Sequence, residues 1–144
     1  MSIVKSASAY YKPLGKAGLG KVSTQSGALK EQPYGFNTRF EDEPGTNPEE
    51  LLGAAHASCF AMALSFALAD AGFEHGELSV EASVSLDKDG DGFSVTQSAL
   101  VLDAVVDGIE PAQFAEIADG AKQNCPISKV LNAEITLSYT LNKG

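Results

Sequence analysis

The pattern of apolar and polar residues is dominated by one long uncharged stretch, Leu51–Ala69. Its apolar residues occur on every side of a helix instead of forming a stripe, which is typical of a buried helix. Asn47 is placed to cap this helix, Pro48 suits its first position, and Gly72 supplies its end. The pattern therefore predicts a long central helix over residues 47–71, with the rest of the chain packed around it.

A stretch of this length approaches the ~20 apolar residues that cross a bilayer. Its flanks, however, are acidic, and neither end carries the Lys or Arg residues that usually anchor a membrane span. Much of the stretch is alanine, and polar residues such as His56 and Ser65 interrupt it. We therefore predict a buried core helix and no membrane partner.

The residues before this helix favour short strands. Residues 3–11 alternate loosely and form a first predicted strand. Residues 21–25 and 28–30 flank Ser26-Gly27, a dipeptide suited to a tight hairpin turn. Residues 36–40 are interpreted as a further extended piece, so the pattern predicts an amino-terminal meander of short strands.

The residues after the helix alternate more clearly. Residues 78–86 have a period of two, and residues 93–106 are expected to return as their hairpin partner. Residues 111–122 have apolar side chains three and four positions apart, which predicts a second helix, and residues 133–141 predict a closing strand. The fold class is therefore α+β, with antiparallel sheets around the central helix in a single domain spanning residues 1–144.

Composition and charge limit the possible partners. The chain has 144 residues, a formal net charge of −9 and only two cysteines. An acidic surface repels phosphate, so nucleic acid is not an expected partner. We find no amino-terminal segment that resembles a secretory signal, and we expect a cytoplasmic protein with reduced thiols.

The two cysteines are the candidate reactive groups. Cys125 precedes Pro126, at the expected start of a short helix, where backbone N–H groups favour a thiolate. Cys59 lies in the middle of the long helix, where activation would require a cation such as Arg39. The alternative is that both are small buried hydrophobic residues, as free cysteines often are.

A metal site is a second alternative. His56 and Cys59 share a helix face, and His75 and Cys125 could complete a four-ligand zinc site. The sequence does not bring the second pair near the first. A hydrogen-bonded core histidine is the simpler explanation of His56.

Three segments of the chain resemble one known family. Residues 45–60, from Gly-Thr-Asn-Pro-Glu-Glu to His-Ala-Ser-Cys-Phe, resemble the signature of the osmotically inducible protein C (OsmC) family, relatives of the organic hydroperoxide resistance proteins. Residues 125–137, beginning Cys-Pro-Ile-Ser-Lys-Val-Leu, resemble the second cysteine segment of the same family. Residues 32–40 resemble the OsmC branch in particular. The resemblance covers essentially the whole chain.

The resemblance implies a thiol peroxidase that reduces organic hydroperoxides, and hydrogen peroxide more weakly, in defence against oxidative or osmotic stress. It implies that Cys59 is the peroxidatic cysteine and Cys125 the resolving one. Arg39 would lower the pKa of Cys59, and Glu49 would orient Arg39. No cofactor is implied, because the cysteines hold both electrons, and an external dithiol, lipoyl-type in some relatives, would reduce the resulting disulfide.

Helix geometry adds one expectation. Glu49 precedes Cys59 by ten residues, which is about 15 Å along one helix. We therefore expect Arg39 and Glu49 to act on Cys59 of a second copy, in agreement with the intertwined homodimer that the resemblance implies. Phe60 and Met62 could contribute to a pocket for alkyl peroxides, or simply to the core. The alternative functions are a thiol redox sensor and a small-molecule or zinc-binding module without efficient turnover.

Overall fold

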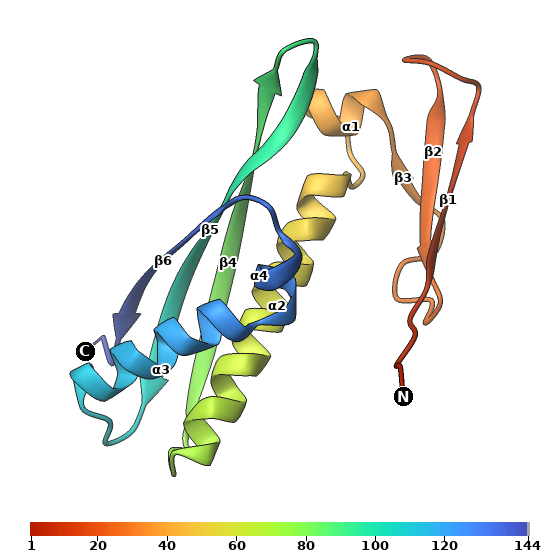
Figure 1. Cartoon of the computed structure of the whole chain (residues 1–144). Coiled ribbons are helices and arrows are strands. Elements are labelled where there is room, and N and C mark those ends of the chain that lie inside the picture. The colour runs from red at the N-terminus through yellow and green to blue at the C-terminus, as the bar shows by residue number, and fades with distance from the viewer. Residues whose placement is uncertain (144) are drawn as a thin grey trace. The chain divides into compact units, whose positions relative to one another are not determined.

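The computed structural model describes residues 1–143, which form two compact units. The first unit is Met1–Leu51 and the second begins at Leu52. Figure 1 labels the elements along the chain, which are β1 (Ala7–Lys12), β2 (Leu19–Thr24), β3 (Gln32–Tyr34), α1 (Phe36–Phe40), α2 (Pro48–Asp70), β4 (Gly76–Asp89), β5 (Gly92–Val106), α3 (Pro111–Asn124), α4 (Pro126–Val130) and β6 (Glu134–Leu141).

The first unit contains the predicted meander. β1, β2 and β3 form an antiparallel sheet in that order, with Ala7 opposite Thr24 in the register. The predicted turn at Ser26-Gly27 is confirmed, since the Gly27 N–H donates to the Thr24 carbonyl at 3.0 Å. The third strand begins at Gln32, later than the sequence predicts.

The prediction of an extended segment over residues 36–40 is wrong, because these residues form the short helix α1. The Gly35 N–H, at the start of the helix, donates to Thr38 Oγ1 at 2.8 Å. The rings of Phe36 and Phe40 lie one helical turn apart with their centroids separated by 5.0 Å. This i, i+4 aromatic pair stabilises a helix, and local contacts of this kind outweigh the strand preference of single aromatic residues.

The long helix α2 begins and ends at the predicted signals. The Glu50 N–H donates to Asn47 Oδ1 at 2.8 Å, which is the expected amino-terminal cap. After the last turn, Gly72 has a φ of +99°, a conformation that favours glycine. By length and composition α2 could also cross a membrane, with a mean hydropathy of 1.7.

Within one chain α2 is buried on a single face, which corrects the prediction of burial on every side. The buried residues are three or four positions apart: Gly53, His56, Phe60, Leu64 and Leu68. Gly53 permits a close approach of α2 to the sheet, because a Cβ there would lie 3.1 Å from the Ala82 carbonyl oxygen. Apolar side chains elsewhere on the helix are exposed, with Met62 at 59% and Phe66 at 63%.

The second unit contains the sheet β4-β5-β6. β4 and β5 form the predicted antiparallel hairpin, but β6 runs parallel to β5, so the prediction of wholly antiparallel sheets is wrong. The physical reason is the connection between them: α3 and α4 form a crossover long enough to return the chain to the starting end of β5.

The core of the second unit lies between this sheet and the helices α2 and α3, which Figure 1 shows packed against it. Its largest buried members come from α2, β5 and α3: Phe60, Leu64, Leu100, Leu102 and Phe114. The same core includes Cys125, at the junction of α3 and α4. The crossover therefore places the second cysteine against α2.

Candidate active site

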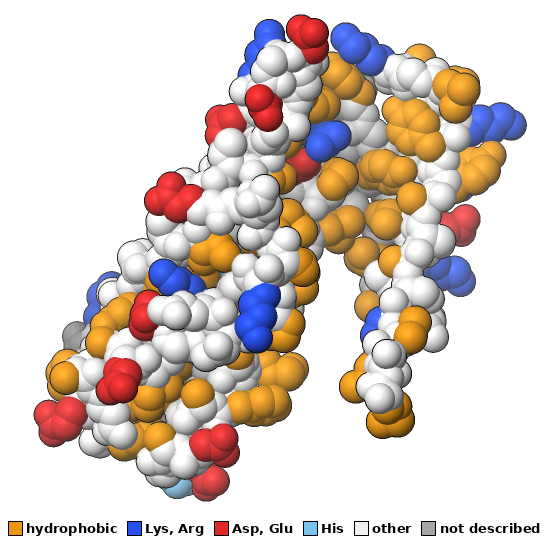
Figure 2. Space-filling model, viewed as in Figure 1, with side chains coloured by type: hydrophobic (Ala, Val, Ile, Leu, Met, Phe, Trp, Pro, Cys, Tyr) orange, Lys and Arg blue, Asp and Glu red, His pale blue; other side chains and the backbone are white. Residues whose placement is uncertain are grey.

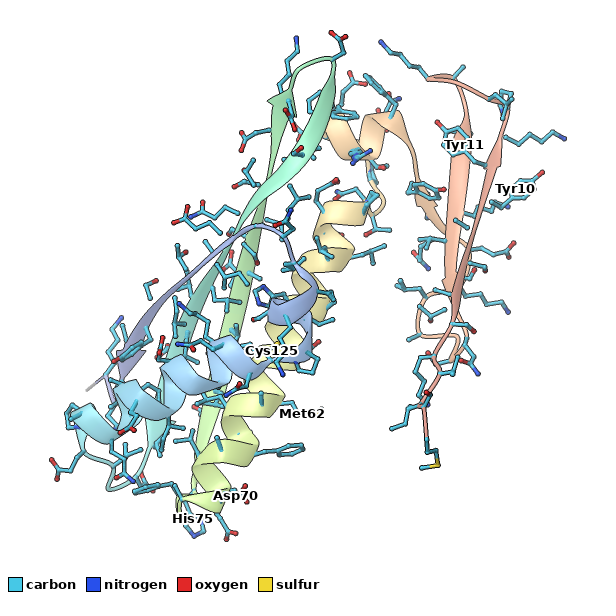
Figure 3. The ribbon with its side chains drawn as sticks, in the orientation of Figure 1. Tyr10, Tyr11, Met62, Asp70, His75 and Cys125 are labelled. Carbon is cyan, nitrogen blue, oxygen red and sulfur yellow. The ribbon has the colours of Figure 1, made fainter. Side chains whose placement is uncertain are left out.

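The two cysteines lie together in the second unit. Cys59 comes from the middle of α2 and is half-buried, whereas Cys125 is buried. Cys125 ends α3 and precedes α4, as Figure 3 shows. Both cysteines are free thiols, and their sulfur atoms are hydrogen-bonded to each other. The fold thus brings together two residues that are far apart in the sequence.

The surroundings of the two thiols shift their pKa values in opposite directions. Burial raises the pKa of the Cys59 thiol, and its hydrogen bond to Cys125 adds to this effect. Burial also acts to raise the pKa of Cys125, but hydrogen bonds from Cys59, Ser128 and the Ile127 backbone outweigh it and lower the pKa. Within this unit the thiolate is therefore more strongly favoured at Cys125 than at Cys59.

A buried hydrogen-bonded cluster adjoins Cys125. His56, on α2, is fully buried, and its Nδ1 lies 2.6 Å from Ser98 Oγ on β5. Its Nε2 lies 2.8 Å from Ser128 Oγ on α4. Ser128 in turn contacts Cys125 through both its side chain and its backbone. A continuous chain of polar contacts therefore runs from Ser98 through His56 and Ser128 to Cys125.

The burial of His56 predicts a pH dependence of stability. Burial lowers the pKa of His56 below its ordinary value of 6.5. As pH falls through 6.5, the unfolded chain binds a proton that the folded chain does not, so the free energy of unfolding decreases. The loss has an upper limit of about 1.4 kcal/mol per pH unit. Urea unfolding of wild type and His56→Gln at pH values on both sides of 6.5 measures it.

The wild type should lose more stability on acidification than His56→Gln does. The matched control is His75→Gln, at an exposed histidine, which should keep the wild-type dependence. Equal pH dependence of wild type and His56→Gln would contradict the prediction.

Arg39 and Glu49 form an ion pair in the first unit. Arg39 Nη2 lies 2.6 Å from Glu49 Oε1, and Arg39 Nε donates to both carboxylate oxygens at 3.1 Å. Arg39 is in the last turn of α1 and Glu49 in the first turn of α2. The side chains are 36% and 12% exposed, so the guanidinium is held in one orientation and still reaches solvent. The predicted pairing of these two residues is therefore found.

A cavity of about 410 Å³ adjoins Arg39 in the first unit. Its walls are largely aromatic, and its lining includes Tyr11, Tyr34, Phe36, Phe40 and Arg39. Lys16 lies 5.0 Å from the centre of the Phe36 ring, as a second cation at this cavity. The cavity thus combines an apolar wall with positive charge, a combination suited to an organic molecule that carries a polar group.

The residues proposed as an alkyl-peroxide pocket beside Cys59 separate in the structure. Phe60 is fully buried and belongs to the core. Met62 is exposed and lines a different cavity, of about 590 Å³, together with Ser58 and Phe66. Figure 2 shows that hydrophobic side chains are exposed on each of the two units.

The structure does not assemble the zinc site that the sequence allowed. In residues 1–143 no group of three or more His, Cys, Asp or Glu side chains is arranged to hold a metal ion. Both ring nitrogens of His56 contact serine hydroxyls instead. The interpretation of His56 as a hydrogen-bonded core histidine is therefore confirmed.

Sequence reasoning missed the serine partners of His56 and the aromatic cavity. Ser98 is a polar residue at a buried position of β5, and Ser128 follows Cys125 by three residues in α4. The spacing of Ser128 alone could have indicated a contact with Cys125 across one helical turn. The hydrogen bonds of His56 to the two serines join α2, β5 and α4, so no local sequence pattern could predict them.

Comparisons with known proteins agree on one family. Residues 40–140 match the model of the OsmC-like protein family. The chain is 54% identical over 141 residues to Peroxiredoxin OsmC of Escherichia coli K12, covering 98% of this chain and 99% of that protein. It is 33% identical over 98 residues to the organic hydroperoxide resistance protein of Xanthomonas axonopodis pv. citri, covering 67% of each.

A solved structure supports the same relationship. The chain is similar to the organic hydroperoxide resistance protein OhrB of Bacillus subtilis, with a TM-score of 0.68 and 27% identity. The match covers 94% of this chain and 98% of that one. Fold and sequence agree along nearly the whole chain, and the chain therefore belongs to the OsmC-like protein family, as an oxidoreductase of the peroxiredoxin type.

Proposed function

We propose that this protein reduces organic hydroperoxides, and hydrogen peroxide more weakly, with Cys59 as the peroxidatic cysteine and Cys125 as the resolving cysteine. The observation that carries the proposal is the hydrogen-bonded contact between the two thiols. Two thiols in contact are placed for one sulfur to attack the sulfenic acid of the other and form a disulfide. The names of the relatives, a peroxiredoxin and an organic hydroperoxide resistance protein, support the substrate class.

The reaction balances with the two cysteines alone. The Cys59 thiolate attacks one peroxide oxygen, the O–O bond breaks, and the alkoxide leaves as an alcohol after taking a proton. Cys59 is then a sulfenic acid. The Cys125 sulfur attacks the Cys59 sulfur, the S–O bond breaks, and the hydroxyl leaves with one proton as water. An external dithiol then reduces the disulfide and is itself oxidised.

Activation of Cys59 is assigned to the ion pair of Arg39 and Glu49. The groups around Cys59 in its own unit raise its pKa, so a cation is needed to favour the thiolate. Arg39 is held by Glu49 in a fixed orientation and is partly exposed. Its aromatic cavity offers an apolar surface for the organic part of a hydroperoxide.

We assign this ion pair to Cys59 of a partner subunit in a homodimer. Glu49 and Cys59 lie ten residues apart on α2, a single helix from Pro48 to Asp70, and ten residues rise about 15 Å. The exposed apolar side chains of α2, Met62 and Phe66 among them, are suited to burial against a second copy. Such a dimer would bury α2 on its remaining faces. We place it in the cytoplasm, where thiols stay reduced.

Stoichiometric oxidation tests the function. Reduced protein is mixed with cumene hydroperoxide, or with hydrogen peroxide, and free thiols are counted as peroxide is consumed. We expect two thiols lost per peroxide, faster consumption of cumene hydroperoxide, and repeated turnover when a dithiol such as dihydrolipoamide is added. A protein that loses its thiols once and is not turned over by dithiols would be a redox sensor instead. Failure to consume peroxide would reject both.

A further inference from the structure

The cluster of Ser98, His56 and Ser128 has no part in the two steps assigned above, although it adjoins the resolving cysteine. All four side chains are buried, with His56, Ser98 and Cys125 at 0% exposed and Ser128 at 8%. Polar side chains buried this deeply must all be satisfied, and no described buried side-chain nitrogen or oxygen lacks a partner. The arrangement is therefore specific, and it ends on a reacting atom.

The directions of the hydrogen bonds follow from the number of protons. Ser128 has one hydroxyl proton, and it contacts both Cys125 and His56 Nε2. When Cys125 is a thiolate, the Ser128 hydroxyl donates to its sulfur, so Ser128 Oγ must accept from His56 Nε2–H at 2.8 Å. Neutral His56 then carries no proton on Nδ1, which accepts from the Ser98 hydroxyl at 2.6 Å. One tautomer of His56 satisfies every contact.

We propose that His56 is a positioning residue that turns the Ser128 hydroxyl toward Cys125 and so keeps the resolving cysteine ready to attack as a thiolate. The inference rests on the proposed function for the roles of the cysteines. Beyond the two cysteines, Arg39 and Glu49, it assigns control of disulfide formation to His56 and Ser128. Hydrogen bonds to a charged acceptor are stronger than neutral ones, so loss of this donor has a measurable effect on Cys125.

The step concerned is disulfide formation. The Cys125 thiol loses its proton, its sulfur forms a bond to the Cys59 sulfur, and the S–O bond of the sulfenic acid breaks. The hydroxyl leaves with one proton as water, so one thiol and one sulfenic acid give one disulfide and one water. The titratable groups in contact with Cys125 and Ser128 are Cys59 and His56, both from α2. β5 contributes only the hydroxyl of Ser98 to this cluster.

The first experiment requires no peroxide. In a Cys59→Ala background Cys125 is the only cysteine, and its ionisation is followed by the ultraviolet absorbance of the thiolate as pH is raised. Adding Ser128→Ala should raise the pKa of Cys125 by about one pH unit. His56→Leu should raise the pKa of Cys125 by a similar amount. His56→Gln retains an amide donor and should restore most of the wild-type pKa. Ser138→Ala, at an exposed serine of β6, should leave the pKa unchanged.

The second experiment follows a single turnover with cumene hydroperoxide and separates sulfenic acid formation from disulfide formation. At neutral pH, Ser128→Ala should form the sulfenic acid at the wild-type rate but the disulfide about three- to tenfold more slowly. The fraction of Cys125 present as thiolate falls up to about tenfold, and the greater nucleophilicity of the more basic thiolate offsets only part of this loss. The deficit should disappear as pH is raised. The double variant His56→Leu/Ser128→Ala should be no slower than either single variant, since both act through one hydroxyl.

The outcomes separate this inference from the proposed function. Unchanged Cys125 ionisation in both Ser128→Ala and His56→Leu overturns the inference, even if wild type consumes peroxide normally. A shifted ionisation in a protein that does not consume peroxide supports the cluster and rejects the peroxidase. If His56→Leu does not fold, Ser128→Ala decides the result alone.

Discussion

Cys59→Ser is expected to abolish the consumption of hydroperoxide. A serine hydroxyl at this position is not ionised near neutral pH and is a far weaker nucleophile than a thiolate, so the loss should exceed about 1,000-fold. Stopped-flow mixing with cumene hydroperoxide, followed by residual peroxide and by free thiols, measures it. The Cys125 thiol should remain reduced in this variant.

Cys125→Ser is the matched control for the assignment of roles. This variant should consume one equivalent of peroxide at nearly the wild-type rate and accumulate a Cys59 sulfenic acid, which dimedone traps. Wild type should not be trapped, because Cys125 removes the sulfenic acid. Peroxide consumption by Cys59→Ser at the wild-type rate would reject the peroxidatic role of Cys59 and transfer it to Cys125, whose pKa is the lower of the two.

Arg39→Met is expected to slow the first step by about 10- to 1,000-fold at neutral pH. A cation beside a thiol lowers its pKa by about one to three units, and the reacting fraction of thiolate falls accordingly when the charge is removed. The rate of Cys59 oxidation by cumene hydroperoxide, measured across a range of pH, should recover in the variant as pH rises. Glu49→Gln should have a smaller effect, since the guanidinium remains.

Two controls accompany Arg39→Met. Lys21→Met removes a cation of the same unit from an exposed ion pair with Glu31 and should leave the rate unchanged. Mixed dimers of Arg39→Met and Cys59→Ser chains test the assignment to a partner subunit. Activity should return on mixing, because one site then combines an intact Cys59 with the intact Arg39 of the other chain. No recovery in verified mixed dimers would place both residues in the same chain.

The sequence predicted both ends of α2, which depend on neighbouring residues. The cap at Asn47 and the end at Gly72 each act within one turn of α2, so both could be located from the residue types alone. The parallel direction of β6 could not, because it depends on how far the crossover of α3 and α4 carries the chain. The helix α1 was missed because residues 36–40 were interpreted as an extended segment, whereas Phe36 and Phe40 form a ring contact across one helical turn.

The candidate site divides in the same way. The two cysteines and Arg39 were candidates from the residues themselves. Their roles and the partnership of Arg39 with Glu49 came from a family resemblance, and the observed ion pair agrees with it. The contact between Cys59 and Cys125 depends on packing between α2 and the crossover, which no local pattern encodes. His56 was recognised as a candidate, but its two serine partners come from β5 and α4 and required the structure.

The contact between the two thiols also bears on the survival of the enzyme at high peroxide concentrations. Many thiols are inactivated when a second peroxide converts the sulfenic acid to a sulfinic acid, which most cells cannot reduce. In this fold Cys59 and Cys125 are already in side-chain contact, so with the roles proposed above the resolving sulfur is at hand when the sulfenic acid forms. The sulfenic acid therefore has a short lifetime in which to meet a second oxidant. If the proposed roles hold, the crossover that carries Cys125 protects Cys59 from further oxidation by the substrate.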